Sequence, residues 1–142
     1  MAEIVLPEDS NSRGTIFGGR VLALIDKCAA IAAMRHAQSE VVTASLDSVD
    51  FHSSVRVGNV LVLKGRLNAV FRSSMEIEVE VLAEDPLTGS RRLTTRAFVT
   101  MVAMGPAGHP VAAPPLEAAD DDARARVAAA ERRRAARTAR RS

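Results

Sequence analysis

The chain has 142 residues, which suits one domain of ordinary size, and a formal net charge of +2. A single cysteine excludes an intramolecular disulfide, and the scarcity of aromatic residues means that aliphatic residues and alanine must build the core. From Glu117 onward there are eight Arg against five acidic residues, so the basic charge belongs to the tail. No basic and then apolar leader opens the chain, which predicts a soluble cytoplasmic protein without a membrane span.

The N-terminal segment predicts a short strand and a turn. Glu3 to Leu6 is short and apolar, as an edge strand would be, and Pro7 to Gly14 is rich in polar turn residues. Gly18 and Gly19 then stand at the expected start of a helix. The first N–H groups of a helix lack internal partners and can bind an oxyanion, although on local sequence alone a tight entry turn is the simpler interpretation.

A strongly apolar helix is expected from Val21 to Ala33. Apolar residues recur at the spacing of one helix face, and most of the other positions are apolar too, which is typical of a helix buried on most sides. Asp26 lies within it and is costly to bury without a partner. It is therefore either a position at the rim of the core or a catalytic base in a partly dry cleft. Cys28, on the buried face, is expected to be core.

The next part of the chain predicts four β-strands. After an exit loop over Arg35 to Glu40, they are Val41–Phe51, Leu61–Phe71, Met75–Val81 and Arg92–Met101. The links between them are short, which favours antiparallel pairing. One face of the sheet is apolar and needs a cover, which the helix supplies, and Gly65 on that face would let the two approach closely. We expect an α+β domain with one long helix wrapped by an antiparallel sheet.

The C-terminal part predicts no further core. We place the domain at residues 1–105, a linker rich in Pro, Ala and Gly at 106–116, and a tail rich in Ala and Arg at 117–142. The tail offers almost no apolar face beyond alanine and Val127, and is expected to be disordered or marginally helical. It could serve as an arm for nucleic acid, but no aromatic residue interleaves with its arginines, so a solvated tail is favoured and nucleic acid is not expected as a partner.

Three motifs together resemble the hotdog-fold acyl-CoA thioesterases, and more narrowly the acyl-CoA hydrolase branch with brain-type acyl-CoA hydrolase and small bacterial single-domain homologues. They are PEDSNSRGTIFGGRVLALIDKCAAIAAMRH, VVTASLDSVDFHSSVRVG and SSMEIEVEV, within about residues 4 to 104. The resemblance leaves the tail outside. It implies a hotdog fold in which a long central helix is wrapped by a curved antiparallel sheet. It also implies homodimers paired edge to edge, active sites at the dimer interface, and trimers of dimers.

The resemblance assigns roles to residues near the helix. The family's catalytic carboxylate falls on Asp26 and its essential asparagine on Asn11, with different protomers contributing the two. Asp26 would act as general base on water or as nucleophile through an anhydride, and the sequence leaves both open. Asn11 would orient the water or the carbonyl, and a backbone N–H of Gly18 or Gly19 would hold the oxyanion. The residue before the glycines is often His in this branch and is Phe17 here.

The phosphates of coenzyme A require basic groups at the mouth of the site. The candidates are Lys64, Arg66, Arg72, Arg91 and Arg92, with Ser73 and Ser74 as hydrogen-bonding groups. Each alone is better explained as a solvated residue of a strand face or turn. Phe17, Val49 and Phe51 are further candidates for substrate contacts. The strand that holds Val49 and Phe51, together with the helix of the partner subunit, is expected to affect acyl-chain selectivity. The three histidines have no metal-ligand spacing, so neither metal nor separate cofactor is expected; coenzyme A is part of substrate and product.

The main hypothesis is a thioesterase that hydrolyses fatty acyl-CoA to free acid and CoA. Another hotdog enzyme, such as a hydratase, is an alternative, but such enzymes usually need a His beside the carboxylate, and none lies near Asp26 in the sequence. A second alternative is a non-enzymatic acyl-CoA sensor whose arginine-rich tail binds nucleic acid. The acyl-chain length that the protein prefers does not follow from the sequence.

Overall fold

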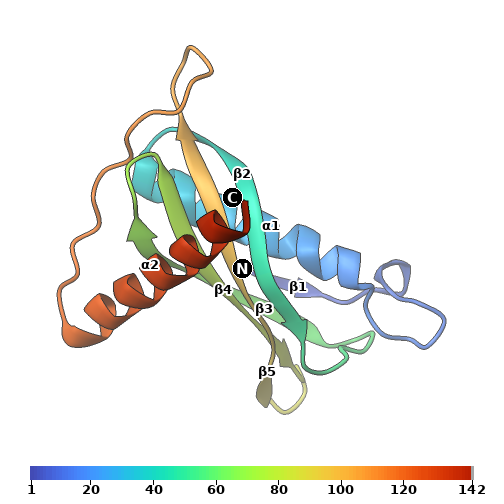
Figure 1. Cartoon of the computed structure of the whole chain (residues 1–142). Coiled ribbons are helices and arrows are strands. Elements are labelled where there is room, and N and C mark those ends of the chain that lie inside the picture. Colours follow the sequence, from blue (N-terminus) through green and yellow to red (C-terminus); the bar gives the residue numbers. More distant parts are fainter. Residues whose placement is uncertain (142) are drawn as a thin grey trace.

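A computed structural model describes residues 1–141 (Figure 1). Its elements are β1 (Ala2–Ile4), a 3-10 turn η1 (Pro7–Asp9), α1 (Gly18–Ala37), β2 (Glu40–Phe51), β3 (Val60–Val70), β4 (Ser74–Glu84), β5 (Arg91–Met104) and α2 (Asp121–Arg141). The five strands form one antiparallel sheet in the order β1-β3-β4-β5-β2. The expected N-terminal edge strand is therefore at the edge, but it begins and ends slightly earlier than the sequence indicated.

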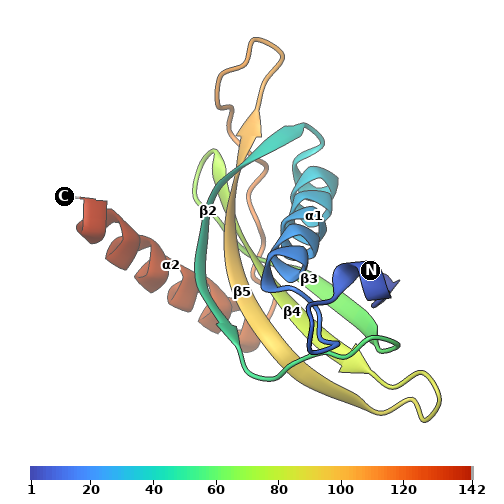
Figure 2. The ribbon, with the colours of Figure 1, turned by 90° about the vertical axis from the view of Figure 1, so that its right-hand side faces the viewer.

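The sheet curves around α1, which lies against its inner face, while α2 crosses its outer face (Figure 2). The expected architecture of a long helix wrapped by a curved antiparallel sheet is present. Alternating residues of the central strands point inward and are fully buried, as the alternation in the sequence predicted; they include Ile77, Val79, Val99 and Met101. Within the described part of the chain, no helix has the length and apolar character that a membrane span requires.

Helix α1 begins at Gly18, as expected, but it ends later than the sequence indicated. The expected exit loop over Arg35 to Glu40 is shorter, because the helix continues to Ala37. Gln38 then adopts a left-handed conformation (φ 54°), and its N–H donates to Met34 O at 2.8 Å. This C-cap completes the last turn, where Arg35 also suits the negative end of the helix dipole.

Helix and sheet approach closely at Gly65, as its place on the inner face predicted. A Cβ atom added there would lie 3.2 Å from Cys28 Sγ, tighter than ordinary contact. Cys28 is buried, in agreement with its assignment to the core. Burial raises the pKa of its thiol, and the positive N-terminal ammonium offsets part of that rise.

The tail differs from the disordered or marginal segment that the sequence suggested, since Asp121–Arg141 forms a helix against the outer face of the sheet. Arg133 Nε lies 2.7 Å from Glu76 Oε1, and Arg137 Nη1 lies 2.8 Å from Asp47 Oδ2. The Arg133 guanidinium also lies 3.7 Å from the centroid of the Phe98 ring. The helix is therefore anchored by arginines to carboxylates of the sheet, and it also buries Ala130 completely.

Candidate active site

Asp26 is exposed, as are Ile31 and Met34 further along α1. The expectation of a helix buried on most sides was wrong, because only six of the 20 residues of α1 are buried. Thr43 of β2 donates a hydrogen bond from Oγ1 to Asp26 Oδ1 at 2.6 Å. The same hydroxyl lies 3.5 Å from Met101 Sδ on β5. No other hydrogen bond to the Asp26 carboxylate is made within residues 1–141, so one oxygen is held and the other is free to meet a substrate or water.

Asn11 lies in a tight turn that its own side chain builds. Its Oδ1 accepts hydrogen bonds from the N–H of Arg13 at 2.9 Å, and from the N–H and hydroxyl of Thr15 at 3.3 and 3.2 Å. These donors identify that atom as the amide oxygen. The amide nitrogen has no partner within the described chain. Asn11 therefore keeps an N–H₂ donor that the turn does not use.

The N-terminus of α1 offers two more donors. Phe17 is the N-cap residue and makes no side-chain cap, and the first backbone bonds run from Arg20 and Val21 to Phe17 O at 3.1 and 3.3 Å. The N–H groups of Gly18 and Gly19 consequently have no hydrogen-bond partner among residues 1–141. Unpaired N–H groups at a helix N-terminus form a site for an oxyanion.

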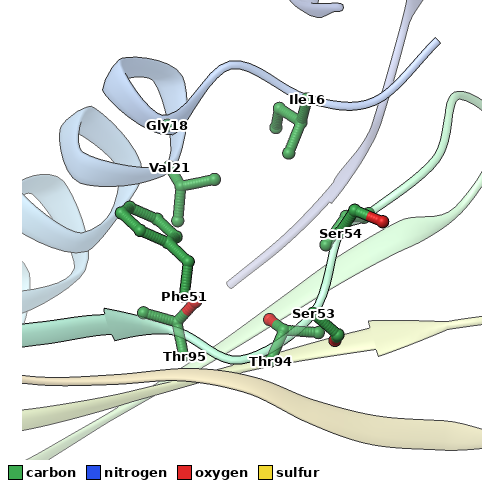
Figure 3. Close-up of a pocket in the computed structure, with 9 residues that line it drawn as sticks. Ile16, Gly18, Val21, Phe51, Ser53, Ser54, Thr94 and Thr95 are labelled. Atoms are coloured by element: carbon green, nitrogen blue, oxygen red, sulfur yellow. The ribbon is translucent and has the colours of Figure 1, made fainter. Parts of the chain in front are cut away.

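A pocket of about 350 Å³ adjoins this helix start (Figure 3). It is lined by Ile16, Gly18, Val21, Phe51, Ser53, Ser54, Val55, Thr94 and Thr95. The ring of Phe51 extends from the end of β2 toward Gly18, and a Cβ atom added to Gly18 would lie 3.5 Å from Phe51 Cζ. At Gly19, an added Cβ would meet nothing within 4 Å. Gly18 therefore faces the pocket and Gly19 faces open space.

The single chain carries these groups in two places. Asp26 is two helical turns beyond Gly18, about 12 Å along the axis at the rise of an α-helix. Within residues 1–141, no hydrogen bond joins Asp26 to Asn11. One place thus has a carboxylate held by Thr43, and the other has the donors of Asn11 and of the helix start.

The basic candidates are spread over the molecule. Arg91 Nε pairs with Glu84 Oε1 at 2.6 Å, and Arg92 Nη2 donates to Ser54 O at 2.6 Å, so both are engaged within the chain. Lys64 and Arg66 are exposed on β3, opposite Glu80 and Glu78 of β4.

Arg72 is exposed in the β3–β4 turn, with Ser73 and Ser74 beside it. Met75, which follows Ser74, is paired with Met101 of β5, and Met101 is paired in turn with Thr43 of β2. These three residues form one row across the sheet. That row places the turn two strands from Thr43, a separation of about 10 Å. Among the basic candidates, Arg72 is therefore the one for which the strand register gives a position near Asp26.

The remaining candidates differ in exposure. Phe17 is half-exposed beside the glycines, whereas Val49 packs against the core. His36 Nε2 lies 2.7 Å from Pro114 O, and no histidine hydrogen-bonds to Asp26 within the described residues. In the same part of the chain, no three His, Cys, Asp or Glu side chains are grouped as metal ligands. Sequence reasoning missed Thr43, the residue that holds Asp26.

Comparison with known proteins identifies the family. A model described as thioesterase superfamily matches residues 13–90, more than half of the chain. The chain belongs to the thioesterase superfamily. This superfamily member is 42% identical over 110 residues to a Bacillus subtilis protein named acyl-CoA thioester hydrolase YkhA, itself uncharacterized, and the match covers 78% of the chain. The chain spans 64% of that relative's length, and 18 and 34% of two mammalian thioesterases that it also matches.

Solved thioesterase structures extend the likeness to the whole chain. An apo-hexameric acyl-CoA thioesterase is 46% identical with a TM-score of 0.94, covering 100% of this chain and 91% of its own. An acyl-CoA hydrolase from Staphylococcus aureus, solved with butyryl coenzyme A and coenzyme A, is 36% identical with a TM-score of 0.91, covering 99% of this chain and 86% of its own. The hotdog fold is thereby confirmed. The family model ends at residue 90, within the range that the sequence motifs covered, whereas the first structural match also includes α2.

Proposed function

We propose that this protein is an acyl-CoA thioesterase that hydrolyses the thioester of fatty acyl-CoA to free acid and CoA. The observation that carries the proposal is the exposed carboxylate of Asp26 on the central helix, held by the Thr43 hydroxyl. Its relatives in sequence and structure, named acyl-CoA thioester hydrolases or thioesterases, support the substrate class. Coenzyme A is then part of substrate and product.

Variants of the Staphylococcus aureus enzyme support the choice of residues. In that enzyme an asparagine, an aspartate and a threonine have each been replaced by alanine in solved structures. The three positions are separated by the same intervals that separate Asn11, Asp26 and Thr43 in this chain. We therefore assign the site to these three residues and the glycines of the helix start.

Asp26 activates the attack on the thioester carbonyl. It acts as general base on a water molecule, or as nucleophile through an anhydride, and its free oxygen suits either role. The departing thiolate is the conjugate base of a thiol with a pKa of about 8.5, so it leaves without a strong general acid. One carboxylate without a catalytic triad is therefore sufficient for this reaction.

The donors stabilise the charge that develops on the carbonyl oxygen. The N–H groups of Gly18 and Gly19 point outward at the positive end of the helix dipole, and the Asn11 amide orients the carbonyl or the water. One such donor contributes about 3 kcal/mol to lowering the barrier. Binding of the CoA phosphates falls to the exposed basic residues, of which Arg72 lies nearest to the row of Thr43.

A second copy of the chain completes the site. The two groups of residues are separated along α1, and β2 is an edge strand that can pair with β2 of another protomer. Exposed apolar residues lie on the same two elements, namely Ile31, Met34 and Val42. We infer a homodimer in which Asp26 of one protomer meets Asn11 and the glycines of the other, and a trimer of dimers like the hexameric relatives. The cytosolic names of mammalian relatives support a cytoplasmic location.

The test is release of free thiol from acyl-CoA by the full-length protein and its Asp26→Asn variant. The variant should lose at least about a hundredfold in kcat, because the amide can neither take a proton from water nor attack. The control is Asp122→Asn, which changes an exposed carboxylate at the start of α2, on the outer face. Near-wild-type turnover by Asp26→Asn would refute the assignment.

A further inference from the structure

The pocket beside the start of α1 touches the proposed oxyanion donors. Gly18 contributes to its lining, and the N–H of Gly18 has no partner within residues 1–141. A thioester carbonyl bound to this N–H places the rest of the acyl group at the mouth of the pocket. The pocket is therefore continuous with the site that the proposed function requires.

The lining suits an uncharged chain. Among the described residues that line the pocket none is charged, and Ile16, Val21 and Val55 give it apolar walls. Val55, Thr94 and Thr95 are almost fully buried and close its inner part. The Thr94 hydroxyl is already used, since it donates to Val81 O at 3.0 Å. The lining offers the phosphates of coenzyme A no cation, only the hydroxyls of Ser53, Ser54 and Thr95, whereas its apolar walls suit an aliphatic acyl chain.

The wall opposite α1 is braced by hydrogen bonds at three points. Arg92 Nη2 donates to Ser54 O at 2.6 Å, Ile16 N–H donates to Val55 O at 2.8 Å, and the N–H of His52 donates to Thr94 O at 2.8 Å. These bonds join the loop after β2 to the segment before α1 and to β5. The side chains of the lining therefore define the space that this pocket offers.

Phe51 is the side chain that limits this space. It is the one aromatic residue in the described lining, and 51% of its surface is exposed at the rim. Its ring spans the gap between β2 and Gly18, as Figure 3 shows. A volume of about 350 Å³ is near the lower end of ligand pockets, which measure about 300–1,000 Å³. Removing the ring would enlarge the pocket at its mouth.

We propose that this pocket receives the acyl chain of the substrate and that Phe51 determines the chain length it accepts. The inference rests on the proposed function, because it takes the thioester to lie at Gly18. Phe51 acts on the acyl chain by contact and takes no part in the chemistry at the carbonyl. It is a specificity-determining residue of the same site.

The experiment measures binding of S-alkyl-CoA thioethers of increasing length, which the enzyme cannot cleave, by calorimetry on the full-length oligomer. Affinity should rise about fourfold for each methylene that becomes buried. It should level off at the chain length that fills the pocket, and we call this length the break. In Phe51→Ala this break should move to longer chains by several methylenes, and in Phe51→Trp to shorter ones. Leu87→Ala is the control, since Leu87 is 94% exposed in the β4–β5 turn and should leave the break unchanged.

The inference is overturned if Phe51→Ala and Phe51→Trp keep the wild-type break, or if affinity does not depend on chain length in the wild type. Should Phe51→Ala not fold, Phe51→Leu replaces it and must shift the break in the same direction. Thiol release from matching acyl-CoA esters separates the two claims. If the wild type binds thioethers with the expected break but releases no thiol, the proposed thioesterase activity is contradicted. If the wild type turns over acyl-CoA but the Phe51 variants keep its break, only the role of Phe51 is contradicted.

Discussion

The Thr43 hydroxyl donates a 2.6 Å hydrogen bond to Asp26 Oδ1 and so joins the middle of α1 to the edge strand β2. Both residues are exposed in the single chain, on the edge at which a second copy can pair. A carboxylate with one oxygen held keeps a fixed orientation before substrate arrives, and such preorganisation lowers the barrier of a reaction. The bond therefore connects the fold to the proposed chemistry.

Removing the Thr43 hydroxyl should lower kcat about ten- to a hundredfold, because a misplaced reacting group costs rates of that order. Thr43→Val keeps the shape of the side chain, so KM and the melting temperature should change little. Thr43→Ser keeps the hydroxyl and should retain most of the turnover. Steady-state kinetics with one acyl-CoA checks both variants. Equal turnover by the Val and Ser variants would show that the hydrogen bond has no positioning role.

Thr43 was not predicted from the sequence, for a reason that lies in the strand register. Several threonines occur on the strands, and nothing local distinguishes Thr43 from Thr94 or Thr100. Its position opposite Asp26 depends on a contact between residues 17 apart in sequence and on a register shift between Thr43 and Ser45. The carboxylate itself was recognisable, because a charge on an apolar helix is unusual.

Asn11→Asp separates the two tasks of the Asn11 side chain. The carboxylate keeps an oxygen that accepts from Arg13 and Thr15, so the turn should survive, but it loses the N–H₂ donor. Activity should therefore fall about a hundredfold, as for loss of one donor to a developing oxyanion, with little change in melting temperature. Asn11→Ala should lose both activity and the turn. High activity in Asn11→Asp would mean that only the turn matters.

The two glycines should respond differently to alanine. A methyl group at position 18 points toward Phe51 and the pocket, whereas one at position 19 points into open space. Neither contact is short, so both variants should fold, and both keep their backbone N–H. Gly18→Ala should lower kcat/KM for acyl-CoA more strongly than Gly19→Ala, because its methyl group occupies the path of the acyl chain. Equal losses, measured with the same substrate, would contradict this placement of the substrate.

Cys28 should be unreactive in the native protein. The thiolate is the nucleophilic form, and burial raises the pKa of this thiol above its ordinary value of 9.0. At pH 8 iodoacetamide should modify the denatured chain and leave the native one unlabelled, as mass spectrometry would show. The thiol ionises at a lower pH in the unfolded chain than in the folded protein. Its contribution to the free energy of unfolding is therefore fully present below pH 9.0, and it is lost as the pH rises toward the pKa of the folded state. Rapid native labelling would contradict the burial.

The inner layers of the fold were predictable, whereas the outer helix was not. The apolar run of α1 and the alternation in β4 depend on periods that are visible within a few residues. Helix α2 has only a weak signal of this kind, since Val127 is its one apolar residue larger than alanine. Its anchors are 57 and 90 residues away in sequence, at Glu76 and Asp47. The alternation in β4 predicted that Glu76 points away from the core, but it did not indicate that a helix covers this residue.

The ion pair between Arg133 and Glu76 should decide whether α2 remains docked. Glu76 is 3% exposed, so replacing Arg133 by alanine leaves a buried carboxylate without its partner and removes the contact with Phe98. Breaking a buried pair in this way costs on the order of 3 kcal/mol, and chemical denaturation of Arg133→Ala should show a loss near that size. Arg132→Ala, next to it but exposed, should stay within about 0.5 kcal/mol of the wild type. Adding Glu76→Gln to Arg133→Ala should recover part of the loss, because a neutral amide is less costly to bury than a charge. Equal stability of the two arginine variants would mean that α2 does not depend on this pair for its position on the sheet.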